Sequence, residues 1–106
     1  MRMLLKVSIP VEAGNEAARN GTLGSTIEKI LAQMNAEAAY FAEENGERTG
    51  FIVFDMQDSS ELPAVAEPFF LAFNARLTVK PVMTPADLAK GMPGIERAVK
   101  AFGAQA

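Results

Sequence analysis

The sequence of 106 residues contains no cysteine and no histidine. Without cysteine the chain cannot form a disulfide, a thiolate nucleophile or a cysteine-ligated metal site. Without histidine it lacks the usual general base near neutral pH, the usual haem ligand and the commonest zinc ligand. Only carboxylates remain as metal ligands, and we expect no metal and no cofactor.

An excess of basic residues is also absent. Ten lysines and arginines stand against thirteen aspartates and glutamates, for a formal net charge of −3. Neutralisation of phosphates supplies most of the affinity of proteins for nucleic acid. The sequence also lacks the aromatic pattern of RNA-recognition motifs. We therefore expect no nucleic-acid partner.

Long apolar runs are missing as well. No stretch approaches the roughly 20 apolar residues that span a bilayer. The apolar residues at the N-terminus are interrupted by Lys6, which favours a strand over a signal peptide. These features predict a cytoplasmic protein with no membrane partner.

What is present is an ordinary globular composition, with 49% apolar and 22% charged residues. A chain of this length has room for one domain. We expect a single domain over residues 1–106, with a core at 1–83 and a helical tail at 84–106.

Apolar and polar residues alternate in four segments, which predicts four strands. The strands are expected at residues 1–9, 36–44, 50–57 and 75–83, with a turn at Asn45-Gly46 between the second and the third.

Apolar residues at helical spacing predict the helices between these strands. The first helical region is expected to begin after Asn15, and a capping box allows a fresh start at Ser25, so one kinked helix and two pieces both remain open. The second helix is expected to be capped by Ser59 or Ser60 and to kink, or end its first segment, at Pro68.

The tail carries a helix start at Thr84-Pro85-Ala86-Asp87. Gly91 and Pro93 are expected to stop that helix. A second short helix is expected over residues 95–102, ended by Gly103.

The resulting order β-α-β-β-α-β predicts an α+β fold of the ferredoxin-like type, with both helices on one face of a four-stranded antiparallel sheet. The other face mixes cations with apolar residues such as Leu4 and Val82, and the second strand is apolar on both of its faces. We therefore expect the open face to pair with a second copy of the chain in a homodimer. The alternative is a monomer whose helix at 95–102 folds over the open face.

Two segments carry a family resemblance: Glu67 to Met83, and the third-strand run Gly50-Phe51-Ile52-Val53-Phe54-Asp55-Met56. They resemble the dimeric α/β-barrel proteins, closest to bacterial members of unassigned activity and more distantly muconolactone isomerase. The resemblance implies the ferredoxin-like fold and the dimer. It implies no particular chemistry, since one fold hosts many activities.

Lys6, Arg76 and Lys80 are expected to share the open sheet face on the first and last strands. Three cations beside an apolar wall form a candidate site for a small organic acid or phosphate. The alternatives are a solvated face and salt bridges to carboxylates of the partner.

A weaker candidate is a catalytic group on the hairpin. Glu43 or Asp55 would be a carboxylate base with a pKa raised by an apolar cavity, and Tyr40 a hydroxyl that orients substrate. The alternative places both carboxylates in solvent or in capping roles.

We thus expect a homodimeric small-molecule-binding or regulatory protein. The alternative is a cofactor-free isomerase or monooxygenase acting on a small hydrophobic acid or lactone.

Overall fold

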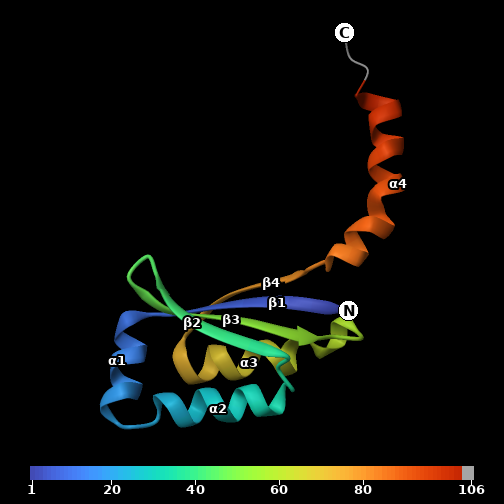
Figure 1. Ribbon diagram of the computed structural model, residues 1–106. Helices are drawn as coiled ribbons and strands as arrows, with labels where there is room; N and C mark the ends of the chain where they lie inside the picture. The colour runs from blue at the N-terminus through green and yellow to red at the C-terminus, as the bar shows by residue number, and fades with distance from the viewer. Residues whose placement is uncertain (104–106) are drawn as a thin grey trace.

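Four antiparallel strands form one sheet in the order β2-β3-β1-β4 in the computed structural model, which describes residues 1–103 (Figure 1). The strands are β1 (Arg2–Ile9), β2 (Ala38–Glu44), β3 (Glu47–Asp55) and β4 (Arg76–Pro81). The helices between them lie on one face of the sheet, and the other face is open. The chain therefore has the predicted α+β architecture with the ferredoxin-like element order.

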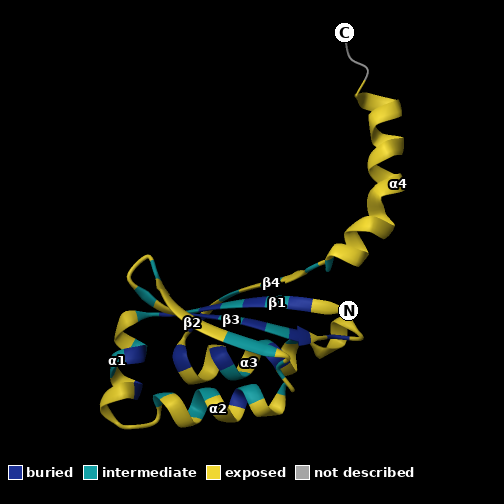
Figure 2. Cartoon of the chain, viewed as in Figure 1, coloured by how far each residue is buried: buried dark blue, intermediate teal, exposed yellow. Residues whose placement is uncertain are grey.

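The strand β1 organises the core because it lies between β3 and β4 and its apolar side chains alternate. Figure 2 shows the buried residues gathered between the sheet and the helices. Every second residue of β1 is buried there with side chains of β3 and of the helix α3 (Leu62–Phe73); the largest fully buried side chains are Phe54, Phe73, Leu5 and Ile52. Strand periodicity thus places one apolar layer against the helices.

The first crossover contains two helices, α1 (Val11–Arg19) and α2 (Leu23–Gln33). The chain breaks between them at Gly21, whose φ of +79° favours glycine. The starts predicted at Asn15 and Ser25 are wrong: α1 begins directly after Pro10, and α2 begins two residues before Ser25. Pro10 is the N-cap of α1, and its carbonyl accepts a hydrogen bond from the Gly14 amide at 2.9 Å, so the first turn is closed before Asn15.

The β2–β3 hairpin is tighter than expected. Glu44 pairs with Glu47 across a two-residue turn in which Asn45 and Gly46 have φ of +55° and +79°. A turn with two positive φ values matches the twist of its strands and lets pairing start at once. The predicted start of the third strand at Gly50 is therefore wrong by three residues.

A short 3₁₀ turn (η1, Ser59–Glu61) precedes α3, and its cap is Asp58 rather than the predicted Ser59 or Ser60. The Asp58 carboxylate accepts a hydrogen bond from the Ser60 amide at 2.8 Å. This bond stabilises the charged form and lowers the pKa of Asp58. The helix α3 continues through Pro68 without ending there.

The helix α4 (Pro85–Phe102) is one helix, so the break predicted at Gly91 and Pro93 is wrong. The start at Thr84 is confirmed: the Thr84 hydroxyl accepts from the Asp87 amide at 3.1 Å, and the Asp87 carboxylate accepts from the Thr84 amide at 3.0 Å. Pro93 removes one internal hydrogen bond, which bends a helix without necessarily ending it.

The helix α4 stands away from the sheet, and the domain with its helix extends 61 Å along its longest axis (Figure 1). No residue of α4 is buried. The monomer in which residues 95–102 fold over the open face is therefore contradicted. Residues 104–106 of the predicted tail lie outside the described residues.

Within residues 1–103 no helix combines the length and the apolar content that crossing a bilayer requires.

Replacing Leu5 by Ala tests the central role of β1. Leu5 is fully buried, so the loss should be about 2–5 kcal/mol of the free energy of unfolding. Urea denaturation followed by circular dichroism measures it. The matched change Leu71→Ala on the exposed side of α3 should cost less than about 0.5 kcal/mol, and an equal loss in both variants would contradict this account of the core.

The cap of α4 predicts a pH effect. Its backbone bond to Thr84 lowers the pKa of Asp87, so the cap contributes above the ordinary carboxyl pKa and is lost as the pH falls through the lowered value. We expect NMR titration of the Asp87 carboxyl to show a midpoint below 3.8. Thr84→Ala should raise that midpoint, because the hydroxyl no longer holds the cap.

Candidate functional site

A pocket of about 680 Å³ opens between the turn end of the β2–β3 hairpin and the helices α1 and α2. Its volume lies within the range of small-ligand sites. It is lined by residues of β1, β2, β3 and the three helices of the core, mainly Val7, Ile9, Val11, Asn15, Leu23, Ile27, Phe41, Glu43, Arg48, Gly50, Ile52 and Phe69. We call this space the hairpin pocket.

Most of the lining of the hairpin pocket is apolar, and its polar residues are Asn15 of α1 and, at the hairpin end, Glu43, Glu47, Arg48 and Thr49. Ile9, Ile52 and Phe69 are buried and form the floor. Val11 and Phe41 stand at the rim, with 46% and 56% of their surface exposed. Water is poorly held by such walls, so an apolar group that replaces it gains free energy.

One cation stands at the pocket, the guanidinium of Arg48 on β3. Its side chain lies on the helix-facing side of the sheet, since Arg48 pairs with Ile9 on β1 and Glu43 on β2. The Arg48 Nη2 donates a hydrogen bond to Asn15 Oδ1 of α1 at 3.1 Å. This bond spans 33 residues of sequence and fixes the position of the charge.

Gly14 makes this approach possible. A Cβ atom at position 14 would lie 2.6 Å from Arg48 Nη1, closer than van der Waals contact allows. Arg48 Nη1 thus lies close to the backbone of α1 at Gly14, and Arg48 Nη2 is hydrogen-bonded to Asn15 Oδ1. The other N–H donors of Arg48 remain available in a planar fork that suits a carboxylate.

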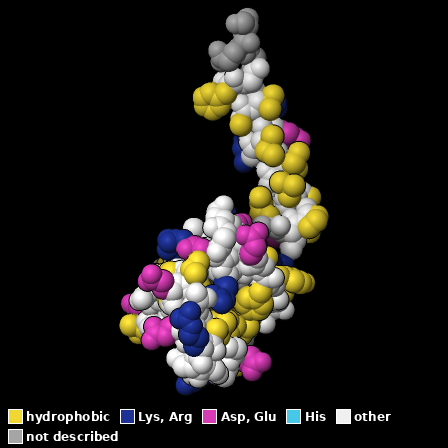
Figure 3. All heavy atoms as spheres, turned by 90° about the vertical axis from the view of Figure 1, so that its left-hand side faces the viewer, with side chains coloured by type: hydrophobic (Ala, Val, Ile, Leu, Met, Phe, Trp, Pro, Cys, Tyr) yellow, Lys and Arg dark blue, Asp and Glu magenta, His cyan; other side chains and the backbone are white. Residues whose placement is uncertain are grey.

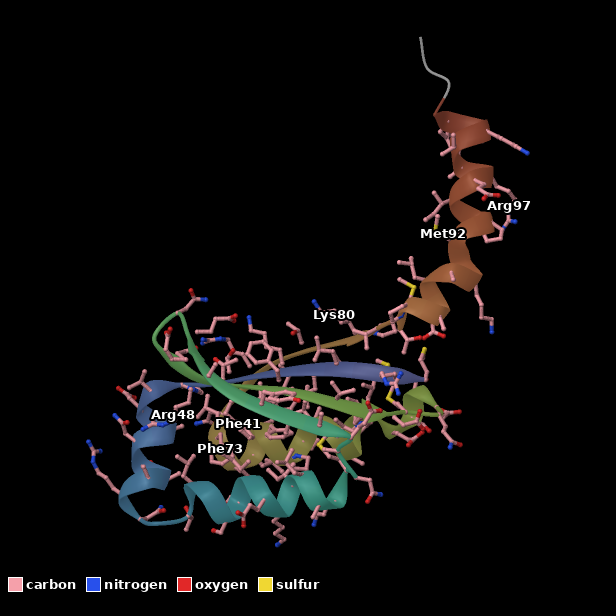
Figure 4. The ribbon with its side chains drawn as sticks, in the orientation of Figure 1. Phe41, Arg48, Phe73, Lys80, Met92 and Arg97 are labelled. Carbon is pink, nitrogen blue, oxygen red and sulfur yellow. The ribbon has the colours of Figure 1, made fainter. Side chains whose placement is uncertain are left out.

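A second glycine shapes the rim. A Cβ at Gly50 would lie 3.1 Å from the Phe41 ring, so the ring covers the strand at that point. Figure 4 shows Phe41 and Arg48 on the helix-facing side of the hairpin, with Phe73 deeper in the layer between sheet and helices.

Of the predicted catalytic residues, only Glu43 lines the hairpin pocket. Its Oε2 accepts a hydrogen bond from the Gly46 amide at 3.0 Å and so closes the turn. Tyr40 lies on the open face, 71% exposed. Asp55 also lies there and binds the N-terminal amino group at 2.9 Å. The three side chains therefore do not converge on one site.

The three predicted cations do share the open face. In the register, Lys6 faces Thr78, Arg76 faces Ser8 and Lys80 faces Leu4. Lys6 forms a salt bridge with Glu44, and Arg76 with Glu47, both within the chain. Arg76 and Lys80 stand four residues apart on β4, about 13 Å along the strand. A second pocket, of about 750 Å³, is lined by Lys6 and Arg76 together with their carboxylate partners Glu44 and Glu47, whereas Lys80 is not part of its lining. The structure therefore brings two of the three predicted cations together.

The remainder of the open face is mixed. Apolar side chains cross its middle. Four ion pairs join the N-terminal amino group, Arg2, Lys6 and Arg76 to Asp55, Glu37, Glu44 and Glu47, and Lys80 is a fifth cation on the same face. Tyr40 is the most exposed large hydrophobic side chain of the four strands. This face is neither a polar solvent face nor a basic patch.

Sequence reasoning missed Arg48. A signal for it exists, since Arg48 is in phase with Gly50, Ile52 and Phe54, the alternate positions of β3 that face the helices. Extending the alternation by two residues places the guanidinium on the buried side. The polar run Glu47-Arg48-Thr49 suggested a loop and hid this register.

Among residues 1–103 no three carboxylates gather closely enough to hold a metal ion.

Two comparisons bear on the chain. A protein-family model described as "Domain of unknown function (DUF3303)" matches residues 1–95. No curated protein matches the chain. The matched residues include the whole sheet and every lining residue of the hairpin pocket.

The close approach of the Arg48 guanidinium to the backbone of α1 is testable with Gly14→Ala. The new methyl group should displace the guanidinium and break its bond to Asn15, while the fold is retained because Ala favours helix by about 1 kcal/mol over Gly. The Asn15 side-chain amide resonances should shift in NMR spectra. Gly24→Ala in α2, where a Cβ meets no atom within 4 Å, is the matched control. Unchanged Asn15 resonances in Gly14→Ala would contradict the geometry.

Proposed function

The chain belongs to the DUF3303 family, a domain of unknown function, and we propose a function from its geometry. We propose that it binds a small organic acid with an apolar body in the hairpin pocket. We also propose that it forms a homodimer through the open sheet face. The single observation that supports the ligand class is Arg48, the one cation among the lining residues of a mainly apolar pocket whose hairpin end also carries Glu43 and Glu47.

The pocket offers one kind of contact for the apolar body of the ligand and another for its carboxylate. Apolar walls stabilise a hydrocarbon or aromatic body by removing it from water, at roughly 25 cal/mol per Å². The guanidinium of Arg48 pairs with a carboxylate through two parallel hydrogen bonds. Asn15 already holds the guanidinium in place, so little side-chain freedom is lost when the acid binds.

Binding is favoured over catalysis by the placement of the candidate groups. Tyr40 and Asp55 lie on the face of the sheet opposite the pocket. Glu43 is engaged with the turn amide. The distant resemblance to muconolactone isomerase suggests the same ligand class, a small acid or lactone, and the isomerase or monooxygenase activity is retained as the less favoured alternative.

The homodimer is supported by the composition of the open face. Exposed Tyr40 and half-buried Leu4, Phe51 and Val53 form an apolar centre without a cover. A sheet with apolar residues on both faces is stabilised by a second layer, and a twofold copy is the commonest source.

Ligand binding is tested with octanoate and benzoate, each compared with its alcohol, octanol or benzyl alcohol. NMR spectra of the ¹⁵N-labelled protein should show shifts at the pocket lining with the acids, and weaker binding of the alcohols. Arg48→Ala should weaken binding of the acids at least about tenfold, since a charge-assisted hydrogen bond contributes about 1.5–3 kcal/mol.

The matched control is Arg19→Ala, which removes an exposed cation of α1 outside the pocket lining. It should bind both acids as the wild type does. Equal losses in the two variants would show a general charge effect, and acids that leave the lining residues unshifted would overturn the proposed ligand class.

The dimer is tested by sedimentation equilibrium. The wild type should have twice the chain mass of 11.3 kDa, and Tyr40→Glu should shift it toward the monomer, because the new charge lies in the apolar centre. Leu71→Glu changes an exposed apolar residue of α3 on the other side of the molecule and should leave the dimer intact. A wild-type mass of 11.3 kDa at high concentration contradicts the dimer.

A further inference from the structure

The helix α4 carries an apolar stripe of which no residue is buried against the rest of residues 1–103. The stripe consists of residues spaced by four, three, four and three positions, namely Leu88, Met92, Ile95, Val99 and Phe102. Their exposed fractions run from 42% at Met92 to 74% at Phe102. This spacing is typical of a helix that packs along its length against another element.

The stripe faces the space above the open sheet face. Figure 4 shows Met92 on the side of α4 turned toward that space and Arg97 on the opposite side. Figure 3, which views the molecule from that side, shows hydrophobic side chains along α4 facing the viewer. The stripe and the open face are thus two walls of one corner, which we call the seat.

We propose that α4 is an arm that packs against a second copy of the chain placed in the seat. The proposal deepens the homodimer proposed above and rests on it for the position of the second copy. It adds that the interface is incomplete without α4, whose stripe lies along the flank of the partner.

The area of the sheet supports this role. Four strands about 4.8 Å apart and about 20 Å long give an open face of roughly 400 Å² in projection. A stable interface buries about 800 Å² per partner. An 18-residue helix is about 27 Å long and 10 Å wide, so α4 enlarges the seat by roughly two-thirds.

The charges of the seat favour a copy of itself as the occupant. The stripe has no charged residue, and the open face carries four ion pairs and one further cation, Lys80, so its charge is close to balanced. A face of one sign would repel its own copy across a twofold axis, whereas a balanced face does not. An acidic or basic partner would require a field of one sign, which the seat lacks.

The helix itself needs a partner. It contains Gly91, Gly94 and Pro93 in its interior, residues that each disfavour helix. Most of the stability of helices in proteins comes from packing of an amphipathic face rather than from propensity. Packing of its apolar stripe is therefore what holds α4 in helical form.

A membrane surface is the competing occupant, because α4 is amphipathic and carries Lys90, Arg97 and Lys100. A flat bilayer cannot enter a corner whose second wall is the sheet, and the stripe faces into that corner. The polar side of α4 also carries Asp87 and Glu96, which anionic lipid would repel.

The test uses the full chain with Val99→Glu on the stripe and Ala101→Glu on the other side of the same helix. Both add one carboxylate near the end of α4, outside the core. In sedimentation equilibrium Val99→Glu should weaken dimerisation at least about tenfold, because a charge would enter an apolar contact. Ala101→Glu should stay within about threefold of the wild type.

A second readout separates packing from a general effect of charge. In Val99→Glu the NMR Cα shifts of residues 85–102 should lose their helical values, while those of the sheet remain. In Ala101→Glu both sets should be retained. A helix that persists in a monomeric Val99→Glu variant would overturn the claim that packing holds α4.

The absence of native cysteine allows a direct test of contact between copies. Unlabelled Val99→Cys protein carrying a spin label is mixed with ¹⁵N-labelled wild type. In a mixed dimer the spin label should broaden amide signals of the ¹⁵N-labelled wild-type chain. A label on Arg19→Cys, at the far end of the molecule from α4 (Figure 1), should broaden different signals. No broadening by the Val99 label in a dimeric sample overturns the arm.

The outcomes also separate the two proposals. A dimer that Tyr40→Glu weakens and Val99→Glu leaves intact keeps the sheet interface and overturns the arm. A monomeric wild type overturns both. A monomer that binds 3:1 phosphatidylcholine–phosphatidylglycerol vesicles, and loses binding with Val99→Glu, assigns the stripe to a membrane and overturns the arm.

Discussion

The structure depends on a sheet that its own helices cover on one side only. Alternation along β1 turns Met3, Leu5, Val7 and Ile9 toward the helices, and burial of this layer is the main stabilising term for so small a chain. The same alternation turns the intervening residues outward. Among residues 1–103 the helices α1, α2 and α3 all lie on the covered side (Figure 1), so the open face follows from the alternation.

The two faces of the sheet take different roles for physical reasons. On the covered face the helices separate from the sheet at the hairpin end, and the hairpin pocket lies there with Arg48 beside α1. Small residues create this site, because Gly14 admits the guanidinium and Gly50 admits the Phe41 ring. On the open face, apolar residues and balanced ion pairs suit a broad contact more than a concentrated charge.

The helix α4, like the open face of the sheet, exposes apolar residues. Its stripe is apolar and unburied, and its interior contains residues that disfavour helix. Such a segment is stabilised by what it packs against rather than by its own propensity. The helices α1 and α2, which line the pocket, and the helix α4 lie on different sides of the sheet (Figure 1), so binding of a ligand and association of copies can be measured separately.

Alternation and helical spacing within single segments determined the α+β class, the four strands and the buried stripe of α3, because these depend on residues a few positions apart. The sequence also determined the start of α4, where Thr84 and Asp87 cap one turn locally. The same alternation places Tyr40 and Glu43, three positions apart on β2, on opposite faces of the sheet. Only the tertiary structure decided that Arg48 meets Asn15 across 33 residues and that α4 continues through Pro93. Strand register and the contacts between distant segments decide such meetings, and neither is encoded in the spacing of neighbouring residues.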